Sequence, residues 1–375
     1  MTKYERLIQI CNAVLFGKSD NLDTLLLVTA EELDDLCNYA SGHGLLPVLA
    51  STFGRIKTDE EKNSDLAETK LEWYLTAEDI KAVSCDMRGA QQQLARLLQK
   101  DALDVMFLKG SCLAQYYSDP TWRESSDIDF YLYGHHKDGI EVLRNAEMEV
   151  WDTDDYHAHA CYKGVSLELH QQFLDMGRLR TNALVEDTLA SLASTEGHQS
   201  FCEWMDEDIT NAYQMTPTMN AIFLMRHLAN HFVAEAVTLR MLYDWGLFLK
   251  NDGKKVDWRR VCDLYEETGM SLFVRRIQQM VIDRMGMPVE HILPLLPMDG
   301  KDTERIWQSV YMPEDDSRQK YHPLVQGIRK RWEMLEEKWK YDIAFPKDPF
   351  WKMWIYMTFR GLKTSKSMLG HTKST

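Results

Sequence analysis

The chain has 375 residues, enough for two or three domains of ordinary size. Hydrophobic residues make up 45% and charged residues 27%, a balance that excludes a largely disordered chain. The formal net charge of −15 argues against broad, non-specific duplex binding, which depends on neutralising phosphates with Lys and Arg. A small local basic site remains compatible with this charge.

Seven cysteines are scattered along the chain without a Cys-x-x-Cys pair, and their number is odd. This pattern argues against a structural zinc site and a secreted disulfide framework, and it favours a reducing compartment. The N-terminal segment lacks the uninterrupted apolar core of a signal peptide. No stretch of about 18 apolar residues predicts a membrane-spanning helix. We therefore expect a cytoplasmic protein.

The first hundred residues are expected to be helical. Apolar residues recur at three- and four-residue spacing from Tyr4 to Leu15, which predicts an amphipathic helix. Thr29 with Glu32 is a capping-box signature for the start of another helix. An apolar stripe then predicts a long helix from about Thr76 to Lys100.

The pattern changes after the first hundred residues, where strand signals begin. The segments that read as strands are Leu103–Leu108, Asp127–Tyr133, His157–Tyr162 and Val165–His170. Lys163-Gly164 between the last two predicts a two-residue hairpin loop. We expect residues 101–173 to be the only α/β part of the chain.

From about residue 178 the chain again reads as helical. Helices are expected within Met219–Leu249, Val256–Met280 and Leu324–Trp339. The predicted fold class is therefore α+β, a small mixed sheet flanked by N-terminal and C-terminal helical blocks. The predicted domains are an N-terminal helical block (1–100), an α/β core (101–175), a C-terminal helical domain (176–340) and an aromatic, basic tail (341–375).

Three carboxylates lie on strand-like segments. Asp127 and Asp129 are two residues apart, so their side chains leave the same face of the strand. Glu168 has the equivalent parity on a later strand, together with His170. If these strands are neighbours, the three like charges converge, and that arrangement is costly unless a cation binds them. Carboxylate oxygens suit Mg²⁺, or Mn²⁺ in its place.

A strand-to-helix turn, Lys109-Gly110-Ser111, precedes these acids. Gly110 lets backbone N–H groups approach a phosphate, and the N-terminus of the following helix favours negative charge. Ser111 offers a hydroxyl, while Lys109 and Arg123 offer cations that can neutralise charge during phosphoryl transfer. We therefore predict these four residues to bind a nucleotide or its phosphates.

In this order the motifs resemble the nucleotidyltransferase superfamily with the DNA polymerase β-like fold. More narrowly, the chain resembles a family of uncharacterised bacterial nucleotidyltransferases. The central matches are Phe107-Leu108-Lys109-Gly110-Ser111, Tyr117, Arg123, Asp127-Ile128-Asp129 and Leu167-Glu168-Leu169-His170. The flanking matches are His43-Gly44-Leu45-Leu46-Pro47, Arg226-His227, His231, Arg240 and Asp244. The resemblance spans about residues 40–250.

The resemblance implies an enzyme that transfers a nucleoside monophosphate from an NTP to a hydroxyl or phosphate acceptor. Asp127 and Asp129 would hold the metal ion bound to the triphosphate. Together with Glu168 they would share a second ion that activates the acceptor. The implied cofactor is Mg²⁺ or Mn²⁺. The acidity of the chain favours a small-molecule acceptor over a nucleic acid.

Less specific interpretations stand beside these. Asp127 and Asp129 can be solvated acids on the open face of an edge strand. Lys109 can simply end a strand with its ammonium group in water, and Arg123 can pair with a nearby acid. The main alternative function is a catalytically silent nucleotidyltransferase-fold protein that acts as a binding or regulatory module. Kinase chemistry at the same metal site is a further alternative.

Three histidines are possible cleft residues. His227 and His231 are four residues apart on an expected helix and so share a face, and His170 adjoins the predicted site. A zinc protease is improbable, because the glutamate of the H-E-x-x-H motif is absent. Packing or hydrogen bonding is the more ordinary role for His227 and His231, whereas a structural and a functional role are equally open for His170.

The C-terminal tail combines basic and aromatic residues. Residues 345–375 contain six Lys or Arg and one acid, and seven large apolar residues lie between 350 and 359. Such a segment can lie on a membrane surface or hold a nucleic acid. We favour a last helix that docks on the body of the protein, since the apolar residues would otherwise form an unusually exposed patch.

Overall fold

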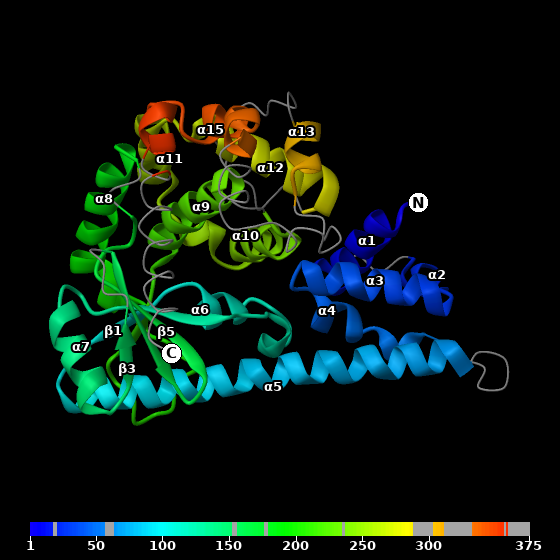
Figure 1. The fold of residues 1–375 in the computed structure, drawn as a ribbon, viewed down its shortest axis with the longest axis horizontal. Helices are drawn as coiled ribbons and strands as arrows, with labels where there is room; N and C mark the ends of the chain where they lie inside the picture. Colours follow the sequence, from blue (N-terminus) through cyan, green and yellow to red (C-terminus); the bar gives the residue numbers. More distant parts are fainter. Residues whose placement is uncertain are drawn as a thin grey trace, which may run out of the picture.

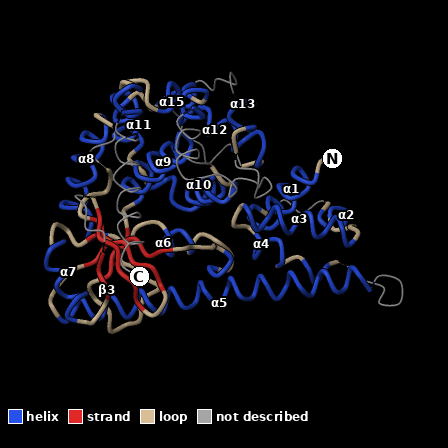
Figure 2. The backbone as a smooth tube through the Cα atoms, in the orientation of Figure 1, coloured by secondary structure: helices blue, strands red, loops and turns tan. Residues whose placement is uncertain are grey.

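A mixed sheet lies between an N-terminal and a C-terminal group of helices (Figure 1; Figure 2), which confirms the predicted α+β class. The structure, a computed structural model, describes residues 1–17, 21–56, 64–151, 156–175, 179–234, 237–287, 303–310, 332–355 and 358. Within these ranges every helix is too short or too polar to cross a lipid bilayer.

The helices fall into three groups along the chain: before, within and after the segment that carries most strands. The N-terminal helices are α1 (Lys3–Phe16), α2 (Leu22–Leu25), α3 (Ala30–Gly42), α4 (Leu46–Ala50) and α5 (Ser64–Lys100). The segment that carries most strands contains α6 (Gly110–Ala114) and α7 (His136–Asn145). The C-terminal helices are α8 (Thr181–Glu196), α9 (Pro217–Ala234), α10 (Leu239–Asp252), α11 (Trp258–Thr268), α12 (Ser271–Met285), α13 (Thr303–Gln308) and α15 (Lys338–Ala344). Short 3-10 helices are η1 (Phe53–Arg55), η2 (Pro120–Trp122), η3 (Gly197–Gln199) and η4 (Gly253–Lys255).

The described part of the sheet has the strand order β3-β4-β5-β2-β1-β6. The strands are β1 (Val105–Phe107), β2 (Asp127–Tyr131), β3 (Glu149–Trp151), β4 (His157–Tyr162), β5 (Val165–His170) and β6 (Ala212–Gln214). β2 runs parallel to β5 and antiparallel to β1. Its register places Asp127 opposite Ser166 and Asp129 opposite Glu168. Because directly paired residues leave the same face of a sheet, the three predicted acids share one face.

Two local predictions are confirmed. At the start of α3 the hydroxyl of Thr29 accepts a hydrogen bond from the Glu32 N–H at 3.2 Å, and the Glu32 carboxylate accepts one from the Thr29 N–H at 3.0 Å. Between β4 and β5, Lys163 and Gly164 have φ values of 50° and 85°. Both are positive, as a tight type I′ hairpin turn requires.

The prediction that residues 101–173 are the only α/β part of the chain is wrong. β6 comes from residues 212–214 and pairs in parallel with β1. Asn211 holds this contact, because its side-chain amide donates to the carbonyl oxygens of Ala95 at 3.1 Å and Leu103 at 2.7 Å. Three residues are too few to display an alternating pattern, so only the tertiary contact identifies the strand.

The long helix α5 begins at Ser64, twelve residues before the predicted start. Its first turns carry exposed Leu71, Tyr74 and Leu75, which obscure the apolar stripe. Packing on the N-terminal helices holds this part, and Trp73 Nε1 donates to Asp34 Oδ1 at 2.8 Å. Its 37 residues span about 55 Å at 1.5 Å per residue. In Figure 1 the helix runs beneath both the sheet and the N-terminal helices.

One face of the sheet is apolar. Ile128, Phe130 and Leu132 are almost completely buried, as their parity predicted, and belong to one hydrophobic cluster with Leu94 of α5 and Leu143 of α7. The acids of β2 and β5 leave the opposite face. The acid-bearing face is the polar face of the sheet, although it also carries the buried Met106 of β1 opposite Tyr131.

The described beginning of the C-terminal tail docks on the helices around it. Asp348 accepts hydrogen bonds from the Thr181 N–H at 3.1 Å and from the Thr181 hydroxyl. Lys347 Nζ donates to the last carbonyl oxygens of α11, those of Glu266 and Glu267. Residues 324–331 of the expected helix and residues 356–357 and 359–375 of the tail lie outside the described residues.

Gly139→Ala should destabilise the protein, because an added Cβ would lie 2.2 Å from Leu132 Cδ1 and 3.1 Å from Leu169 Cδ2. Overpacking of this kind costs about 1–3 kcal/mol. Gly89→Ala is the matched control, since its Cβ would meet nothing within 4 Å on α5. That change should gain about 0.5–1 kcal/mol of helix propensity. Urea unfolding measures both, and a Gly139→Ala protein as stable as the wild type would contradict the packing described.

Candidate active site

The turn between β1 and α6 lies directly against β2. Lys109 and Gly110 both have positive φ values, 43° and 44°, which is an uncommon conformation for Lys. The Leu108 N–H donates to the carbonyl oxygen of Asp129 at 2.9 Å. A Cβ on Gly110 would lie 3.7 Å from Ser125 Oγ and 3.9 Å from the Asp127 carbonyl oxygen. The glycine turn is therefore held beside the strand that carries the two acids.

Asp129 is the most tightly held of the three predicted acids. Its Oδ2 lies 2.9 Å from Lys109 Nζ, and its Oδ1 lies 2.9 Å from His170 Nε2. The same His170 nitrogen is 3.9 Å from Glu168 Oε2. One possible ligand atom from each of Asp129, Glu168 and His170 lies within 4.8 Å of the others. Asp127 is not part of this group.

The pKa values of the three acids are shifted in different directions. Burial opposes ionisation of Asp129, but the charge of Lys109 and the hydrogen bond with His170 outweigh it and lower the pKa. Burial, followed by repulsion from Asp129, raises the pKa of Asp127. Burial, followed by repulsion from Asp129 and Asp127, raises the pKa of Glu168. Asp127 and Glu168 are therefore harder to ionise than free carboxyl groups, whereas Asp129 is easier to ionise.

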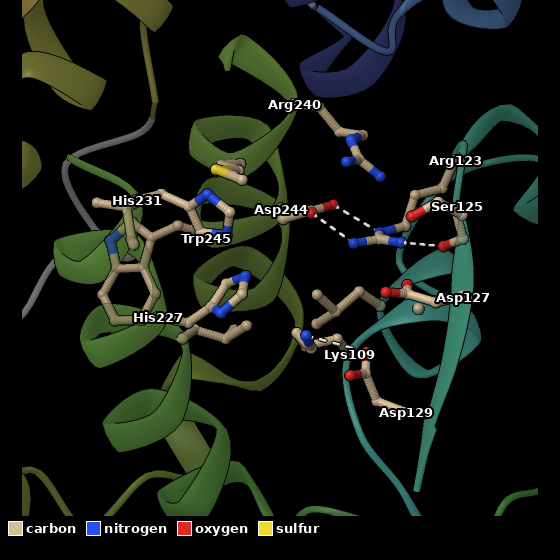
Figure 3. Close-up of a pocket in the computed structure, with 16 residues that line it drawn as sticks. Lys109, Arg123, Ser125, Asp127, Asp129, His227, His231, Arg240, Asp244 and Trp245 are labelled. Atoms are coloured by element: carbon tan, nitrogen blue, oxygen red, sulfur yellow. Dashed lines mark hydrogen bonds and ion pairs between the residues drawn. The ribbon is translucent and has the colours of Figure 1, made fainter. Parts of the chain in front are cut away.

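A cavity of about 170 Å³ separates the polar face of the sheet from α9 and α10 (Figure 3). Lys109, Gly110, Asp127 and Asp129 line it from the sheet, and His227, His231, Arg240 and Trp245 line it from the two helices. The acids thus face a second wall that belongs to the C-terminal helical group. Segments that lie about one hundred residues apart in the sequence form the two walls.

A buried ion pair connects these walls. Arg123 Nε and Nη2 donate to the two carboxylate oxygens of Asp244 on α10 at 3.0 and 2.8 Å (Figure 3). The Tyr117 hydroxyl donates to Asp244 Oδ1 at 2.9 Å, and Arg123 Nη1 donates to Ser125 Oγ at 2.6 Å. Arg123 therefore fixes the loop before β2 against α10.

The N-terminal helical block reaches the same loop. The Leu239 N–H at the start of α10 donates to His43 Nδ1 at 3.2 Å. A Cβ on Gly44 would lie 3.0 Å from Arg240 Nε, and Arg240 Nη1 donates to the carbonyl oxygen of Glu124. The flanking sequence motifs around residues 43–44 and 240–244 therefore meet around the loop that precedes the two acids.

The structure brings most of the predicted site residues together. The cavity lining contains Lys109, Gly110, Arg123, Asp127, Asp129, His227 and His231. Glu168 and His170 lie beside Asp129 on the polar face. Ser111 is the exception, since its hydroxyl donates to Gln91 Oε1 on α5 and so faces away from this cavity.

Sequence analysis missed Ser125, Ser126 and Trp245, which also line the cavity. The sequence could have indicated the two serines as phosphate-binding candidates, because their hydroxyl groups directly precede the Asp-x-Asp motif. Trp245 had none, because its position depends on how α10 packs against the sheet.

The family comparison covers the whole of this site. The family described as "Uncharacterised nucleotidyltransferase" matches residues 29–286, more than two thirds of the chain. The chain belongs to this nucleotidyltransferase family. The match includes every candidate site residue and confirms the resemblance to a nucleotidyltransferase family found in the sequence. No curated protein and no solved structure matches this nucleotidyltransferase family member.

Arg123→Ala should destabilise the protein strongly, because it leaves the Asp244 carboxylate buried without its charge partner. Breaking a buried pair in this way costs about 3–5 kcal/mol. Arg55→Ala is the matched control, since Arg55 pairs with Asp23 where both side chains are exposed. Its expected loss is about 0–1 kcal/mol. Chemical unfolding of both variants measures the difference, and equal small losses would show that the buried pair is not the connection described.

Asp127→Asn and Asp129→Asn should shift the stability of the metal-free protein in opposite directions at pH 7. Folding raises the pKa of Asp127, so the folded protein favours the protonated, neutral form of this side chain. The stability that this form contributes is lost as pH rises through the folded pKa. The neutral amide introduced by Asp127→Asn should therefore stabilise the protein above that pH. Folding lowers the pKa of Asp129, so its contribution is present above the unfolded pKa of about 3.9. Asp129→Asn should therefore cost about 1.5–3 kcal/mol for each charge-assisted hydrogen bond lost.

Thermal unfolding in EDTA at several pH values tests this pair of variants. The gain from Asp127→Asn should appear as pH rises above the acid range, and the deficit from Asp129→Asn should shrink as pH falls below about 4. Shifts of the same sign at pH 7 would contradict the charge distribution described.

Proposed function

We propose that this protein is a metal-dependent enzyme that moves a nucleoside monophosphate from an NTP to a hydroxyl or phosphate group of an acceptor. The observation that carries the proposal is the position of Asp127 and Asp129, which line one cavity together with the Lys109-Gly110 turn. Membership of a nucleotidyltransferase family supports the reaction class. We propose a small-molecule acceptor, since the chain is strongly acidic.

The acids fit a divalent cation of the Mg²⁺ or Mn²⁺ type. Carboxylate oxygens are the ligands that these ions prefer. Burial, followed by repulsion from Asp129, raises the pKa values of Asp127 and Glu168, and a bound cation would offset both effects. We assign Asp127 and Asp129 as the principal ligands and Glu168 as a further ligand. When bound there, the cation would neutralise phosphate charge and favour attack by the acceptor hydroxyl.

The remaining residues of the sheet side bind and position the phosphates in this proposal. Lys109 keeps its charge, because Asp129 and Asp127 raise its pKa despite the opposing effect of burial. Gly110 allows close approach of the backbone, and Ser125 and Ser126 offer hydroxyl donors in place of Ser111. Arg123 is a positioning residue, since the Asp244 carboxylate and Ser125 already occupy its guanidinium group.

The helical wall suits the acceptor. His227 faces the acids across the cavity (Figure 3), and burial, followed by the charges of Lys109 and His231, holds its pKa well below the ordinary value. A neutral imidazole can accept a hydrogen bond from an acceptor hydroxyl. The cavity of about 170 Å³ is smaller than the roughly 300–1,000 Å³ of sites that enclose a whole ligand. We therefore propose that it encloses the reacting groups and leaves the nucleoside outside.

One observation favours the alternative of a catalytically silent binding or regulatory module. Both carboxylate oxygens of Asp129 already have partners, Lys109 and His170, at 2.9 Å. Catalysis would require Lys109 to release Asp129 when substrate binds, whereas a silent module would keep this contact. The two functions therefore differ in whether nucleotide is turned over.

Incubation with ATP labelled at the α or the γ position tests the proposed reaction. Nucleotidyl transfer should leave the α label on an acceptor from cell extract and release pyrophosphate. Thermal unfolding should also shift with Mg²⁺ and the preferred NTP, since ligand at about 100 times its Kd contributes about 2.7 kcal/mol. Asp127→Asn should lose both responses, and Asp138→Asn, an exposed acid of α7, is the matched control that should keep them.

Three outcomes separate the alternatives. Label retained only from the γ position would indicate kinase chemistry and defeat nucleotidyl transfer. A thermal shift without transfer of either label would support the silent module. No response to any NTP, in wild type or variant, would remove nucleotide binding from the proposal altogether.

A further inference from the structure

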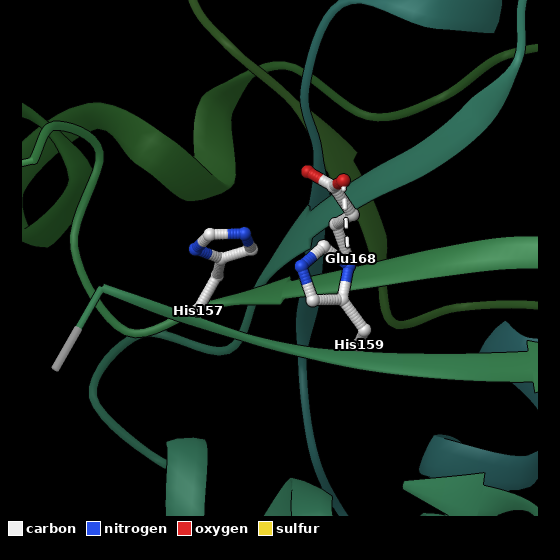
Figure 4. A group of neighbouring side chains, drawn as sticks. All are labelled: His157, His159 and Glu168. Carbon is white, nitrogen blue, oxygen red and sulfur yellow. Dashed lines mark ion pairs between the residues drawn. The ribbon is translucent and has the colours of Figure 1, made fainter. Parts of the chain in front are cut away.

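Two histidines of β4 lie beside Glu168 on the polar face of the sheet (Figure 4). His157 and His159 are two residues apart and leave the same face, and the register places His159 opposite Glu168. One possible ligand atom from each of the three residues lies within 4.8 Å of the others. Among the described residues, the lining of the cavity above does not include these three.

We propose that His157, His159 and Glu168 bind a divalent transition-metal ion, with Zn²⁺ as the best fit. Two imidazoles and one carboxylate form the protein ligand set of several catalytic zinc and iron sites. Imidazole nitrogen favours such ions over Mg²⁺, which prefers oxygen ligands. The site therefore differs in metal preference from the carboxylate site around Asp127 and Asp129.

The spacing of the ligand atoms supports an ion between them. His159 Nδ1 is 3.5 Å from Glu168 Oε1, which is longer than the roughly 2.7–3.2 Å of an N–H···O hydrogen bond. A tetrahedral zinc ion with bonds of about 2.0–2.1 Å separates its ligand atoms by roughly 3.3–3.4 Å. The observed separation therefore suits two ligands of one ion better than a direct hydrogen bond.

Neighbouring rings hold the two imidazoles in place. The ring centroids of His157 and His159 are 4.4 Å apart in an edge-to-face arrangement. The ring of Trp151 is nearly parallel to that of His159, with a centroid distance of 6.3 Å. The ring of Tyr156 packs edge-on against that of His157, with a centroid distance of 4.7 Å. The side chains of His159 and Glu168 remain 25% and 24% exposed. The site is thus both ordered by its surroundings and open to an ion with its water ligands.

Glu168 couples this site to the candidate active site. Its Oε2 lies 3.9 Å from the His170 nitrogen that contacts Asp129. An ion held by the histidines would therefore draw on a carboxylate that the proposed function assigns to the Mg²⁺ site. This coupling rests on the proposed function, whereas binding of the transition metal does not.

Titration of the metal-free full chain with Co²⁺ tests the site, because Co²⁺ replaces Zn²⁺ and absorbs visible light when bound to imidazole and carboxylate. The background is Cys85→Ser with Cys161→Ser, which removes two exposed thiols that could also bind metal. We expect one equivalent of Co²⁺ to bind and to be displaced by Zn²⁺ but not by Mg²⁺. His157→Gln and His159→Gln should each weaken binding at least about tenfold.

His135→Gln is the matched control, since His135 is the exposed N-cap residue of α7 and pairs with the exposed Asp138. It should bind Co²⁺ as the parent chain does. Thermal unfolding without metal checks that the β4 variants remain folded, and Glu168→Gln supplies a further ligand variant outside β4. Unchanged Co²⁺ absorption in all three ligand variants, or no absorption in the parent, would overturn the inference.

Asp127→Asn separates this inference from the proposed function. The variant should keep the Co²⁺ site and lose the stabilisation by Mg²⁺ with NTP. Histidine-dependent Co²⁺ binding in a chain that responds to no nucleotide would support the metal site and remove the proposed enzyme. A nucleotide response without Co²⁺ binding would support the proposed enzyme and remove the transition-metal site.

Discussion

The buried ion pair between Arg123 and Asp244 is the contact on which the arrangement of the site depends. It joins the loop that precedes β2 to helix α10. Ser125 accepts a further hydrogen bond from Arg123, and Tyr117 donates one to Asp244, so both charged groups have additional partners. Two buried opposite charges tolerate little separation, because each left alone would carry a large desolvation cost. This constraint keeps the acids of β2 opposite α9 and α10, although the two walls come from distant parts of the sequence.

Charge on the polar face of the sheet is distributed unevenly. Lys109 and His170 stabilise the charge of Asp129 and lower its pKa. Burial, followed by repulsion from Asp129, raises the pKa values of Asp127 and Glu168, so their ionisation in the folded protein costs free energy. Buried carboxyl groups that are hard to ionise, on an otherwise well-packed sheet, are typical of a functional site. The opposite face, with Ile128 and Phe130 packed on α5 and α7, supplies the stability that tolerates this cost.

Local signals were the most reliable guides to the fold and the site. The capping box at Thr29, the hairpin at Lys163-Gly164 and the shared face of Asp127 and Asp129 depend on residues close in sequence, and the structure contains all three. β6 escaped detection because three residues carry no period. The direction of Ser111 could not be predicted, since the partner that draws its hydroxyl away, Gln91, lies on another helix.

The sequence by itself determined the α+β class, the family and the residue types of the site, because side-chain parity on a strand and motif order need no knowledge of distant contacts. Only the tertiary structure decided which residues face one another. The pairing of Asp129 with Lys109, the closure of the cavity by His227 and Trp245, and the grouping of His157 and His159 with Glu168 all join separate elements. Such contacts follow from how whole helices and strands pack, and burial of apolar surface acts without regard to sequence distance.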